Sequence, residues 1–254
     1  MALSTKKKTG GKPQGRKSLS DTNLLLLITV IVFVLMYAGA MIFLGEGFLK
    51  AQNFFNILMS QSALIITACG MSLVMITGGI DISVGGVVAL VSMCSAVYLD
   101  FKGGNLFVSI LIALGIGLAY GVVQGFLVAY LDIQPFIVSL AGMFFARGAT
   151  TIVHSNPFNV ENEAFVALKD TRIVVPGLGS VNRLGKYVDA YINIGVIIAI
   201  LVVVLLFVVL RWTKLGRAFY AVGGNRQSAL MLGINVKRTR FVAHVLCSLL
   251  AGVA

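Results

Sequence analysis

Long apolar stretches, separated by short polar ones, follow one another along almost the whole chain. A transmembrane helix needs roughly 20 mostly apolar residues, because it rises about 1.5 Å per residue through a hydrocarbon core about 30 Å thick. Stretches that meet or approach this length occupy residues 24–44, 57–77, 83–99, 106–131, 136–153 and 192–210. The pattern predicts an all-α fold, a polytopic transmembrane helical bundle with about six complete spans.

A seventh apolar stretch opens at Phe241 and reaches Ala254 after about 14 residues, which covers roughly two thirds of a bilayer. We therefore expect the chain to be a fragment. Its transmembrane domain, residues 23–254, would be incomplete at the C-terminus. Residues 1–22 are expected to form a basic tail, and residues 211–240 a loop within the domain.

Composition agrees with this class of protein. The chain is 58% hydrophobic and 11% charged, with a mean hydropathy of +0.97, whereas soluble domains are about 25% charged. A soluble enzyme is thereby excluded. Neither a GxxxxGK[ST] phosphate-binding loop nor a GxSxG nucleophile pattern occurs in the sequence, so we expect no ATPase or hydrolase activity from the chain itself.

The charged residues predict which ends of the spans face the cytoplasm, where Lys and Arg are retained. Segment 211–240 contains no acid and seven bases: Arg211, Lys214, Arg217, Arg226, Lys237, Arg238 and Arg240. The N-terminal tail is also basic, whereas acids and bases balance in segments 45–56, 100–105 and 154–190. Six crossings place both basic segments inside and the balanced segments outside. We expect the tail to contact anionic lipid rather than nucleic acid.

The N-terminus also allows a second interpretation. A basic region, an apolar run and the small triplet Ala38-Gly39-Ala40 together resemble a cleavable secretory signal. An uncleaved first anchor explains the same residues, because the apolar run continues to residue 44 and further spans follow. We favour the anchor.

The motif GGIDISVGG lies between the second and third apolar stretches and places Asp81 beside the membrane. An ionisable group at the centre of a span costs about 2.5–3.5 kcal/mol on insertion scales, so it usually has a role. In one interpretation Asp81 lines the translocation path or a gate, with Ser83 and Gly85 beside it. In the other, which we favour, it caps a helix that starts near Ser83 after a tight Gly78-Gly79 turn. Both can hold, since broken helices line polar paths in transporters.

Three glycines in the fourth stretch, Gly117, Gly121 and Gly125, recur every four residues and share one helical face. This spacing favours close packing against another helix over a role in substrate binding. Gln124 lies next to the face and is placed to form a hydrogen bond across it. The three cysteines fall inside predicted spans, and the two histidines lack ligand neighbours, so we expect neither a disulfide framework nor a metal site nor a bound cofactor.

The inner segment 211–240 contains signals for a short helix. Gly223-Gly224 predicts a turn, Asn225 an N-cap, residues 226–232 two turns of helix, and Gly233 a left-handed C-cap. The helix is basic and partly apolar through Ala229, Leu230 and Leu232. Such a helix suits docking into a groove of a cytoplasmic partner. An amphipathic helix lying on anionic lipid is the alternative.

Three motifs together resemble the permease subunits of bacterial ribose/xylose/galactose-type ABC sugar importers. They are GMSLVMITGGIDISVGGVVAL (70–90), QPFIVSLAGMFFARG (134–148) and LGRAFYAVGGNRQSALMLGINVKRTRF (215–241). The resemblance extends from about residue 24 through the rest of the chain, in order and with matching spacing. Members of that family continue through further spans, which agrees with the expected truncation.

The resemblance implies an importer of the bacterial inner membrane with two permease subunits, two cytoplasmic ATP-binding subunits and a periplasmic sugar-binding protein. The short inner helix would be the coupling helix. The residues that it implies for coupling to the ATPase are Gly216, Arg217, Gly223, Gly224, Asn225, Arg226, Ala229 and Gly233. The sugar is left open.

Two other functions stay open at this stage. An ion-coupled secondary transporter usually carries several charged groups in its spans, and this chain offers little besides Asp81 and Arg147. A non-transporting membrane scaffold would not need a glycine-rich break between two spans.

Overall fold

The structure is a computed structural model that describes residues 21–44, 50–181 and 187–254. In this part of the chain, six helices have the length and apolar composition that a membrane span requires. They are α1 (Asp21–Leu44), α2 (Ala51–Ile76), α3 (Val84–Phe101), α4 (Leu106–Ala129), α5 (Pro135–Val153) and α7 (Ile194–Trp212). The six predicted spans are confirmed as helices. The largest shift is in α2, which begins at Ala51 because polar residues such as Gln52 and Asn56 form its first turns.

Among the described residues, helix α1 belongs to one unit and the elements from Ala51 onwards form a second unit. Apolar side chains cover α1 on every side, from Leu24 to Phe43. A helix that is apolar all round is typical of a membrane span. The triplet Ala38-Gly39-Ala40 lies inside this helix.

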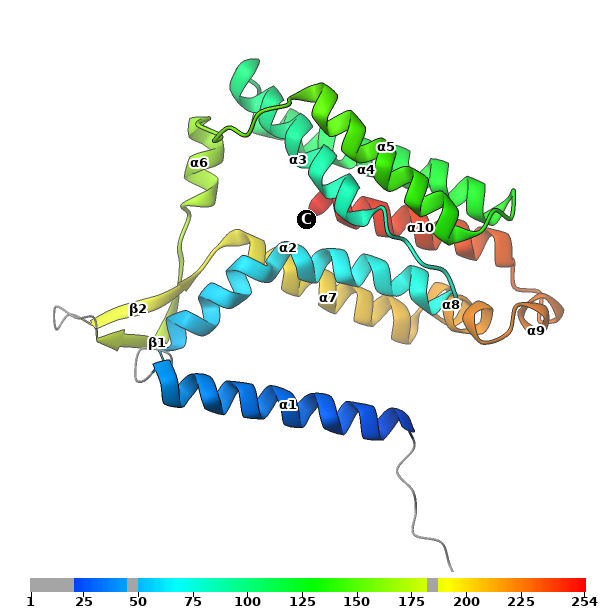
Figure 1. Cartoon of the computed structure of the whole chain (residues 1–254), viewed down its shortest axis with the longest axis horizontal. Helices are drawn as coiled ribbons and strands as arrows, with labels where there is room; N and C mark the ends of the chain where they lie inside the picture. The colour runs from blue at the N-terminus through cyan, green and yellow to red at the C-terminus, as the bar shows by residue number, and fades with distance from the viewer. Residues whose placement is uncertain (1–20, 45–49, 182–186) are drawn as a thin grey trace, which may run out of the picture. The chain divides into compact units, whose positions relative to one another are not determined.

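The second unit is built around α10 (Val236–Val253), which packs along α4 and also contacts α2 and α3. Helix α3 packs on α5, and α2 packs on α7. Figure 1 shows α3, α4, α5 and α10 grouped together, with α2 beside α7. Fully buried residues such as Leu73, Val74, Val87 and Cys247 form the core where these helices meet.

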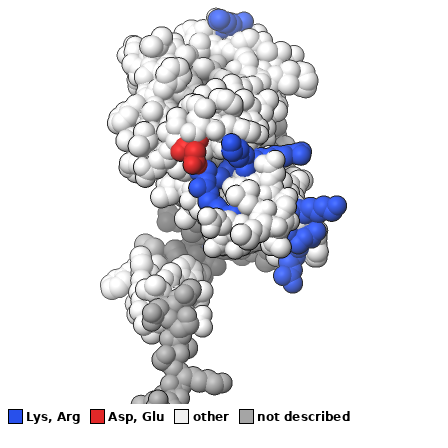
Figure 2. All heavy atoms as spheres, turned by 90° about the vertical axis from the view of Figure 1, so that its right-hand side faces the viewer, with Lys and Arg blue, Asp and Glu red and all other residues white. Residues whose placement is uncertain are grey.

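The connecting segments gather at two opposite ends of this unit. One end carries α8 (Lys214–Gly224) and α9 (Arg226–Met231), and the other carries α6 (Glu163–Lys169), β1 (Ile173–Val181) and β2 (Tyr187–Ile192) (Figure 1). Figure 2 faces the α8–α9 end, where basic side chains gather. The described parts of segments 211–240 and 154–190, which the charge pattern assigned to opposite sides, therefore lie at opposite ends of this unit.

The antiparallel hairpin of β1 and β2 was not predicted from the sequence, which suggested a loop over residues 154–190. Ile173 pairs with Ile192 and Val175 with Ala190, and the register shifts between Val175 and Ser180. Pro176 lies at this irregularity, where a strand tolerates a residue without an N–H. Gln52 of α2 bonds to both the N–H and the carbonyl of Tyr191, which ties the hairpin to the bundle.

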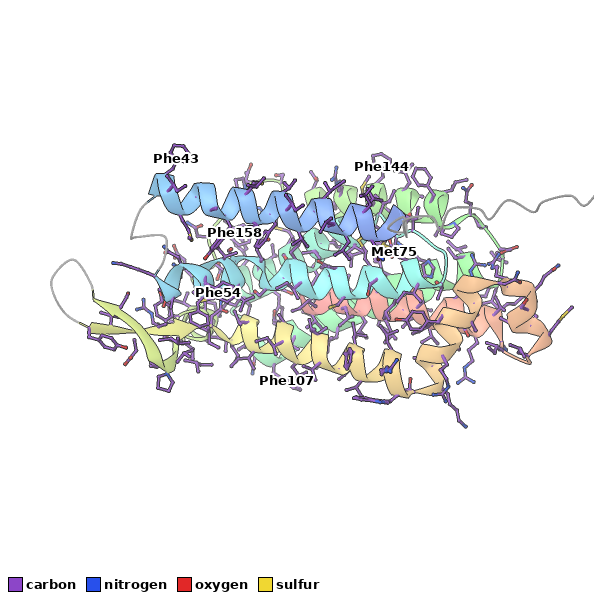
Figure 3. All side chains as sticks on the ribbon, turned by 90° about the horizontal axis from the view of Figure 1, so that it is seen from below. Phe43, Phe54, Met75, Phe107, Phe144 and Phe158 are labelled. Carbon is purple, nitrogen blue, oxygen red and sulfur yellow. The ribbon has the colours of Figure 1, made fainter. Side chains whose placement is uncertain are left out.

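Large apolar side chains point away from the bundle along its length. Phe107 of α4 and Phe144 of α5 are 65% and 62% exposed, and Figure 3 shows both directed outwards. Extensive apolar surface of this kind on soluble proteins is confined to interaction patches, whereas here it covers the spans. The fold is that of a multi-pass membrane protein.

Candidate functional site at the helix break and the inner end

The chain between α2 and α3 forms the predicted break. Gly78 has a φ of +80°, a left-handed conformation that favours glycine, and the N–H of Gly79 donates to the Val74 carbonyl. A side chain at Gly79 would be crowded, since an added Cβ would lie 3.0 Å from Val74 Cγ1, and His244 Cε1 of α10 would be in ordinary contact at 3.7 Å. The tight turn thus brings the chain directly against α10.

Asp81 lies within this break and is 1% exposed. Its Oδ1 accepts hydrogen bonds from the Ser83 N–H at 2.9 Å and from the Ser83 hydroxyl at 2.6 Å. Helix α3 begins at Val84, and the Ser83 side chain makes no cap bond of its own. The carboxylate thus satisfies an N–H just ahead of the helix, as an Asx turn does.

Gln124 of α4 joins this group from 41 residues away in the sequence. Its Nε2 donates to Ser83 Oγ at 2.9 Å, and that hydroxyl donates to Asp81. Gln124 and Ser83 are 3% and 0% exposed. These hydrogen bonds connect α4 to the break. In the sequence, the signal for such a contact was the position of Gln124 next to the glycine face of α4.

Three polar atoms around the break are buried without a hydrogen-bond partner: Asp81 Oδ2, His244 Nε2 and Ser248 Oγ. His244 Nδ1 lies 3.0 Å from the Arg240 carbonyl oxygen, and because a carbonyl only accepts, Nδ1 carries the proton. The carboxylate of Asp81 is near enough for its charge to act on both His244 and Cys247. Sequence reasoning considered His244 only as a metal ligand and missed this polar cluster.

Gly85 does not face this group. It is exposed, with open space where a Cβ would lie. Its neighbour Gly86 is the buried one, and a Cβ there would lie 3.1 Å from Ala146 of α5. The helical start at Val84 turns the two glycines in different directions.

The glycine face of α4 lies against the backbone of α10. Cβ atoms built at Gly117 and Gly121 would lie 2.7 Å from the Ser248 carbonyl oxygen and from Val245 Cα. At Gly125 the nearest atom is the Phe241 carbonyl oxygen, 3.0 Å away. The three glycines therefore allow these two helices to approach closely.

The end of the bundle that carries α8 and α9 is a series of short, capped helices. Thr213 caps α8 through a bond to the Gly216 N–H, Asn225 caps α9 through the Ser228 N–H, and Asn235 caps α10 through the Arg238 N–H. Gly233, with a φ of +76°, follows α9 in the left-handed conformation. The predicted N-cap, short helix and C-cap are thus observed, with α9 ending at Met231.

The predicted Gly223-Gly224 turn is wrong, because both residues end α8. Gly223 is required there by packing, since a Cβ would collide with the Ile76 carbonyl oxygen at the end of α2. Gly216 is likewise closed in by the backbone of Leu210, whereas Arg217 is exposed and its Nη1 donates to the Trp212 carbonyl. Helix α8 is therefore fixed to the C-terminal ends of α2 and α7.

Helix α9 has one buried and one exposed side. Ala229 is 1% exposed and packs with Val222 of α8 and Val236 of α10. Leu230, Met231 and Leu232 are 58%, 89% and 77% exposed. We call the packed side around Ala229 the base of α9, and the exposed residues Leu230, Met231 and Leu232 its apolar tip.

A cavity of about 450 Å³ lies between α9 and the break. Gly78, Asn225, Arg226 and Arg240 are among the residues that line it. Arg240 was expected in a loop, but it lies in the second turn of α10 and is 7% exposed. Among the described residues, no three His, Cys, Asp or Glu side chains come together in a way that could hold a metal ion.

The fold and these sites define a polytopic helical membrane protein with short capped helices at one end. Residues 53–254 match the family described as branched-chain amino acid transport system / permease component, and the chain belongs to this family. No solved structure matches the chain.

Its curated relatives include the fructose import permease protein FruG of Bifidobacterium longum, with 33% identity over 90% of this chain and 65% of the relative. The ribose import permease protein RbsC of Escherichia coli is 36% identical over 83% of this chain and 62% of the relative. The fructose import permease protein FruF of B. longum is 30% identical over 99% of this chain and 69% of the relative. The chain thus spans about two thirds of the lengths of these relatives, which are transport permeases rather than enzymes.

Proposed function

We propose that the chain is the membrane-spanning subunit of an ATP-driven importer and forms the translocation path for a monosaccharide. Its relatives are named as ribose and fructose import permeases, which supports a monosaccharide as substrate. A cytoplasmic ATP-binding subunit supplies the energy, a periplasmic sugar-binding protein delivers the substrate, and a second permease subunit completes the pore. An ion-coupled carrier is not favoured by these relatives.

In this proposal the protein lies in the bacterial inner membrane with residues 1–22 and 211–240 in the cytoplasm. The exposed basic side chains at the α8–α9 end support this orientation, because Lys and Arg are retained inside. The break at Gly78, Gly79, Asp81 and Ser83 shapes the path, since interrupted helices form the polar sites of many transporters.

One observation carries the proposal: α9 is a capped helix with a packed base and an exposed apolar tip. Met231, at 89% exposed, has no structural reason to face water. A helix of this kind can insert its apolar tip into a groove of a partner protein. We propose that α9 is the coupling helix and that Arg226, Ala229 and Gly233 hold it in place.

Purification of the complete protein from its native membranes tests this proposal. An ATP-binding subunit should co-purify in detergent, and Met231→Asp should reduce its recovery by about tenfold or more, as expected for an interface anchor worth at least about 1.4 kcal/mol. Val188→Asp is the matched control, because Val188 is an exposed apolar residue, 49% exposed, in the hairpin at the opposite end.

Transport completes the test. Proteoliposomes that contain the complex and the sugar-binding protein should accumulate ribose or fructose with internal ATP and should not do so with an ion gradient alone. Accumulation driven by the gradient without ATP would reject the ATP-driven importer. Full recovery of the ATP-binding subunit with Met231→Asp would reject α9 as the docking element.

A further inference from the structure

Asp132, in the turn between α4 and α5, has an unusual backbone conformation. Its φ is +52°, and it is the single non-glycine residue with positive φ among those the structure describes. Left-handed conformations are strained for residues with a Cβ, although Asp tolerates them better than most. A glycine would relieve the strain, so the aspartate side chain itself has a reason to be there.

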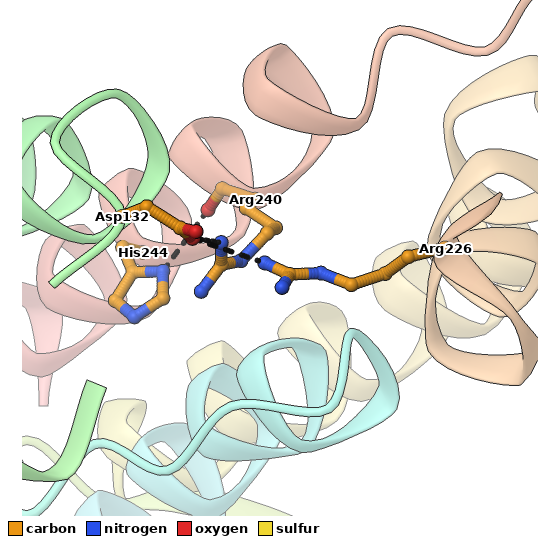
Figure 4. Close-up of polar contacts among 4 residues, drawn as sticks. All are labelled: Asp132, Arg226, Arg240 and His244. Carbon is orange, nitrogen blue, oxygen red and sulfur yellow. Dashed lines mark hydrogen bonds and ion pairs between the residues drawn. The ribbon is translucent and has the colours of Figure 1, made fainter. Parts of the chain in front are cut away.

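The side chain of Asp132 contacts two arginines from two other helices. Its Oδ1 accepts a hydrogen bond from Arg240 Nη1 of α10 at 3.0 Å and lies 3.6 Å from Arg226 Nη2 of α9 (Figure 4). The side chain of Arg240 is 8% exposed, and that of Arg226 is 48% exposed. One carboxylate therefore joins the docking helix to a membrane helix.

The two ion pairs have different roles. Arg240 is buried whereas the Asp132 side chain is 76% exposed, so the carboxylate compensates a buried charge in a pair that solvent partly screens. The pair with Arg226 is open to solvent and adds little to stability. The pair with Arg226 matters because it connects Asp132 to the start of α9, where Arg226 is the first residue.

Arg240 connects this link to the helix break. Its carbonyl oxygen accepts from His244 one helical turn further along α10, and the His244 ring lies beside Gly79. Both arginines and Gly78 line the cavity of about 450 Å³ between α9 and the break. A shift of α9 that moves Asp132 and Arg240 therefore acts directly on the chain around Gly78.

We propose that Asp132 is a positioning residue that ties α9 to α10 and transmits the movement of α9 to the break between α2 and α3. This inference rests on the proposed function, because it takes α9 to be the element that docks on the ATP-binding subunit. Asp132 does not contact that subunit in the proposal. It determines how much of the subunit's movement reaches the membrane helices.

A double-mutant cycle in the complete importer tests this role. Asp132→Asn and Arg226→Gln are the two single variants, and the ATP-binding subunit recovered with each is quantified first, so that import is compared per assembled complex. Each should lower the sugar imported per ATP hydrolysed by about fivefold or more, within the usual range of coupling between sites. Because Asp132→Asn already breaks the contact with Arg226, the double variant should be no worse than Asp132→Asn alone.

Two variants separate positioning from a general loss of charge or stability. Arg238→Gln removes an exposed positive charge from the same end of the protein and should import normally. Asp132→Glu keeps the carboxylate and should restore part of the coupling. Import per ATP that is unchanged in Arg226→Gln, or equally lowered in Arg238→Gln, would overturn the inference. Failure of any ATP-binding subunit to co-purify with the unaltered protein would instead overturn the proposed function.

Discussion

Gln124 on α4 donates a hydrogen bond from Nε2 to Ser83 Oγ at 2.9 Å, and so joins a membrane helix to the break before α3. Both side chains are buried. In the apolar interior of a membrane protein, a polar side chain is retained where it finds such a partner.

Replacing Gln124 with Leu should destabilise the bundle. The Ser83 hydroxyl keeps its bond to Asp81 but loses its donor from α4. We expect a loss of about 0.6–1.7 kcal/mol, the range measured for hydrogen bonds between membrane helices. Unfolding in detergent checks this, with Val123→Leu as control, because Val123 is the neighbouring residue on the exposed side at 58%. Equal unfolding free energies for the two variants would contradict the structural importance of the bond.

Two substitutions at Asp81 separate the effect of its hydrogen-bonding oxygen from the effect of its negative charge. Asp81→Asn keeps an oxygen that can accept the N–H of Ser83. Asp81→Ala leaves that N–H without its acceptor and leaves the Ser83 hydroxyl with Gln124 Oε1, 3.1 Å away, as its acceptor. We expect the Ala variant to lose about 1–3 kcal/mol and the Asn variant to lose less. Chemical denaturation in detergent measures both. If the Asn variant unfolds as readily as the Ala variant, the charge rather than the hydrogen bond is what the break requires.

Gly121 should tolerate no side chain. A Cβ there would lie 2.7 Å from Val245 Cα, a backbone atom that cannot turn away. Gly121→Ala should therefore separate α4 from α10 and cost about 1–3 kcal/mol, as overpacking does. Gly115 is a control on the same helix, with nothing within 4 Å of its added Cβ. Gly115→Ala should be neutral or gain about 0.5–1 kcal/mol, since Ala is the better helix former.

The sequence predicted the local features of this protein well, because each depends on residues close together. The apolar stretches predicted the membrane-spanning helices. Asn225 and Gly233 gave both ends of α9, because an N-cap side chain and a left-handed glycine act on their own backbone. The basic stretch marked one end of the bundle.

Features that depend on contacts between distant residues were missed. The bond between Gln124 and Ser83 and the ion pair between Asp132 and Arg240 each join segments whose proximity only the packed bundle determines. Arg240 was assigned to a loop because apolarity begins at Phe241, although Asn235 caps a helix that already includes the basic residues. The hairpin was missed because Pro176 and neighbouring glycines suggest irregular chain.

Gly233 should be needed for its left-handed conformation rather than for lack of space. No atom lies within 4 Å of an added Cβ, but the φ of +76° costs a residue with a side chain about 1–2 kcal/mol. Gly233→Ala should thus loosen the end of α9, and Gly233→Asn should do so less, since Asn adopts this conformation more readily. Hydrogen exchange of the α9 amides measures the effect. Equal exchange in the two variants would show that the conformation of this residue does not hold the helix end.

At the other end of the bundle, Asp100 should hold the segment that leads into α6. Its carboxylate accepts the N–H of Glu161 at 3.0 Å and that of Asn162 at 2.9 Å, although the three residues are far apart in sequence. Asp100→Ala leaves both N–H groups without their acceptor. We expect local opening of residues 155–170 to become easier by about 1–3 kcal/mol.

Hydrogen exchange would show this as roughly 5- to 150-fold faster exchange confined to that segment, the factor that corresponds to such an energy. Lys102→Ala is the control, because Lys102 is an exposed charge just beyond α3. The ring contacts of Phe101 with His154 and Phe158 remain in both variants and should keep the segment near the bundle. Unchanged exchange in Asp100→Ala would mean that these rings, rather than the carboxylate, hold residues 155–170 in place.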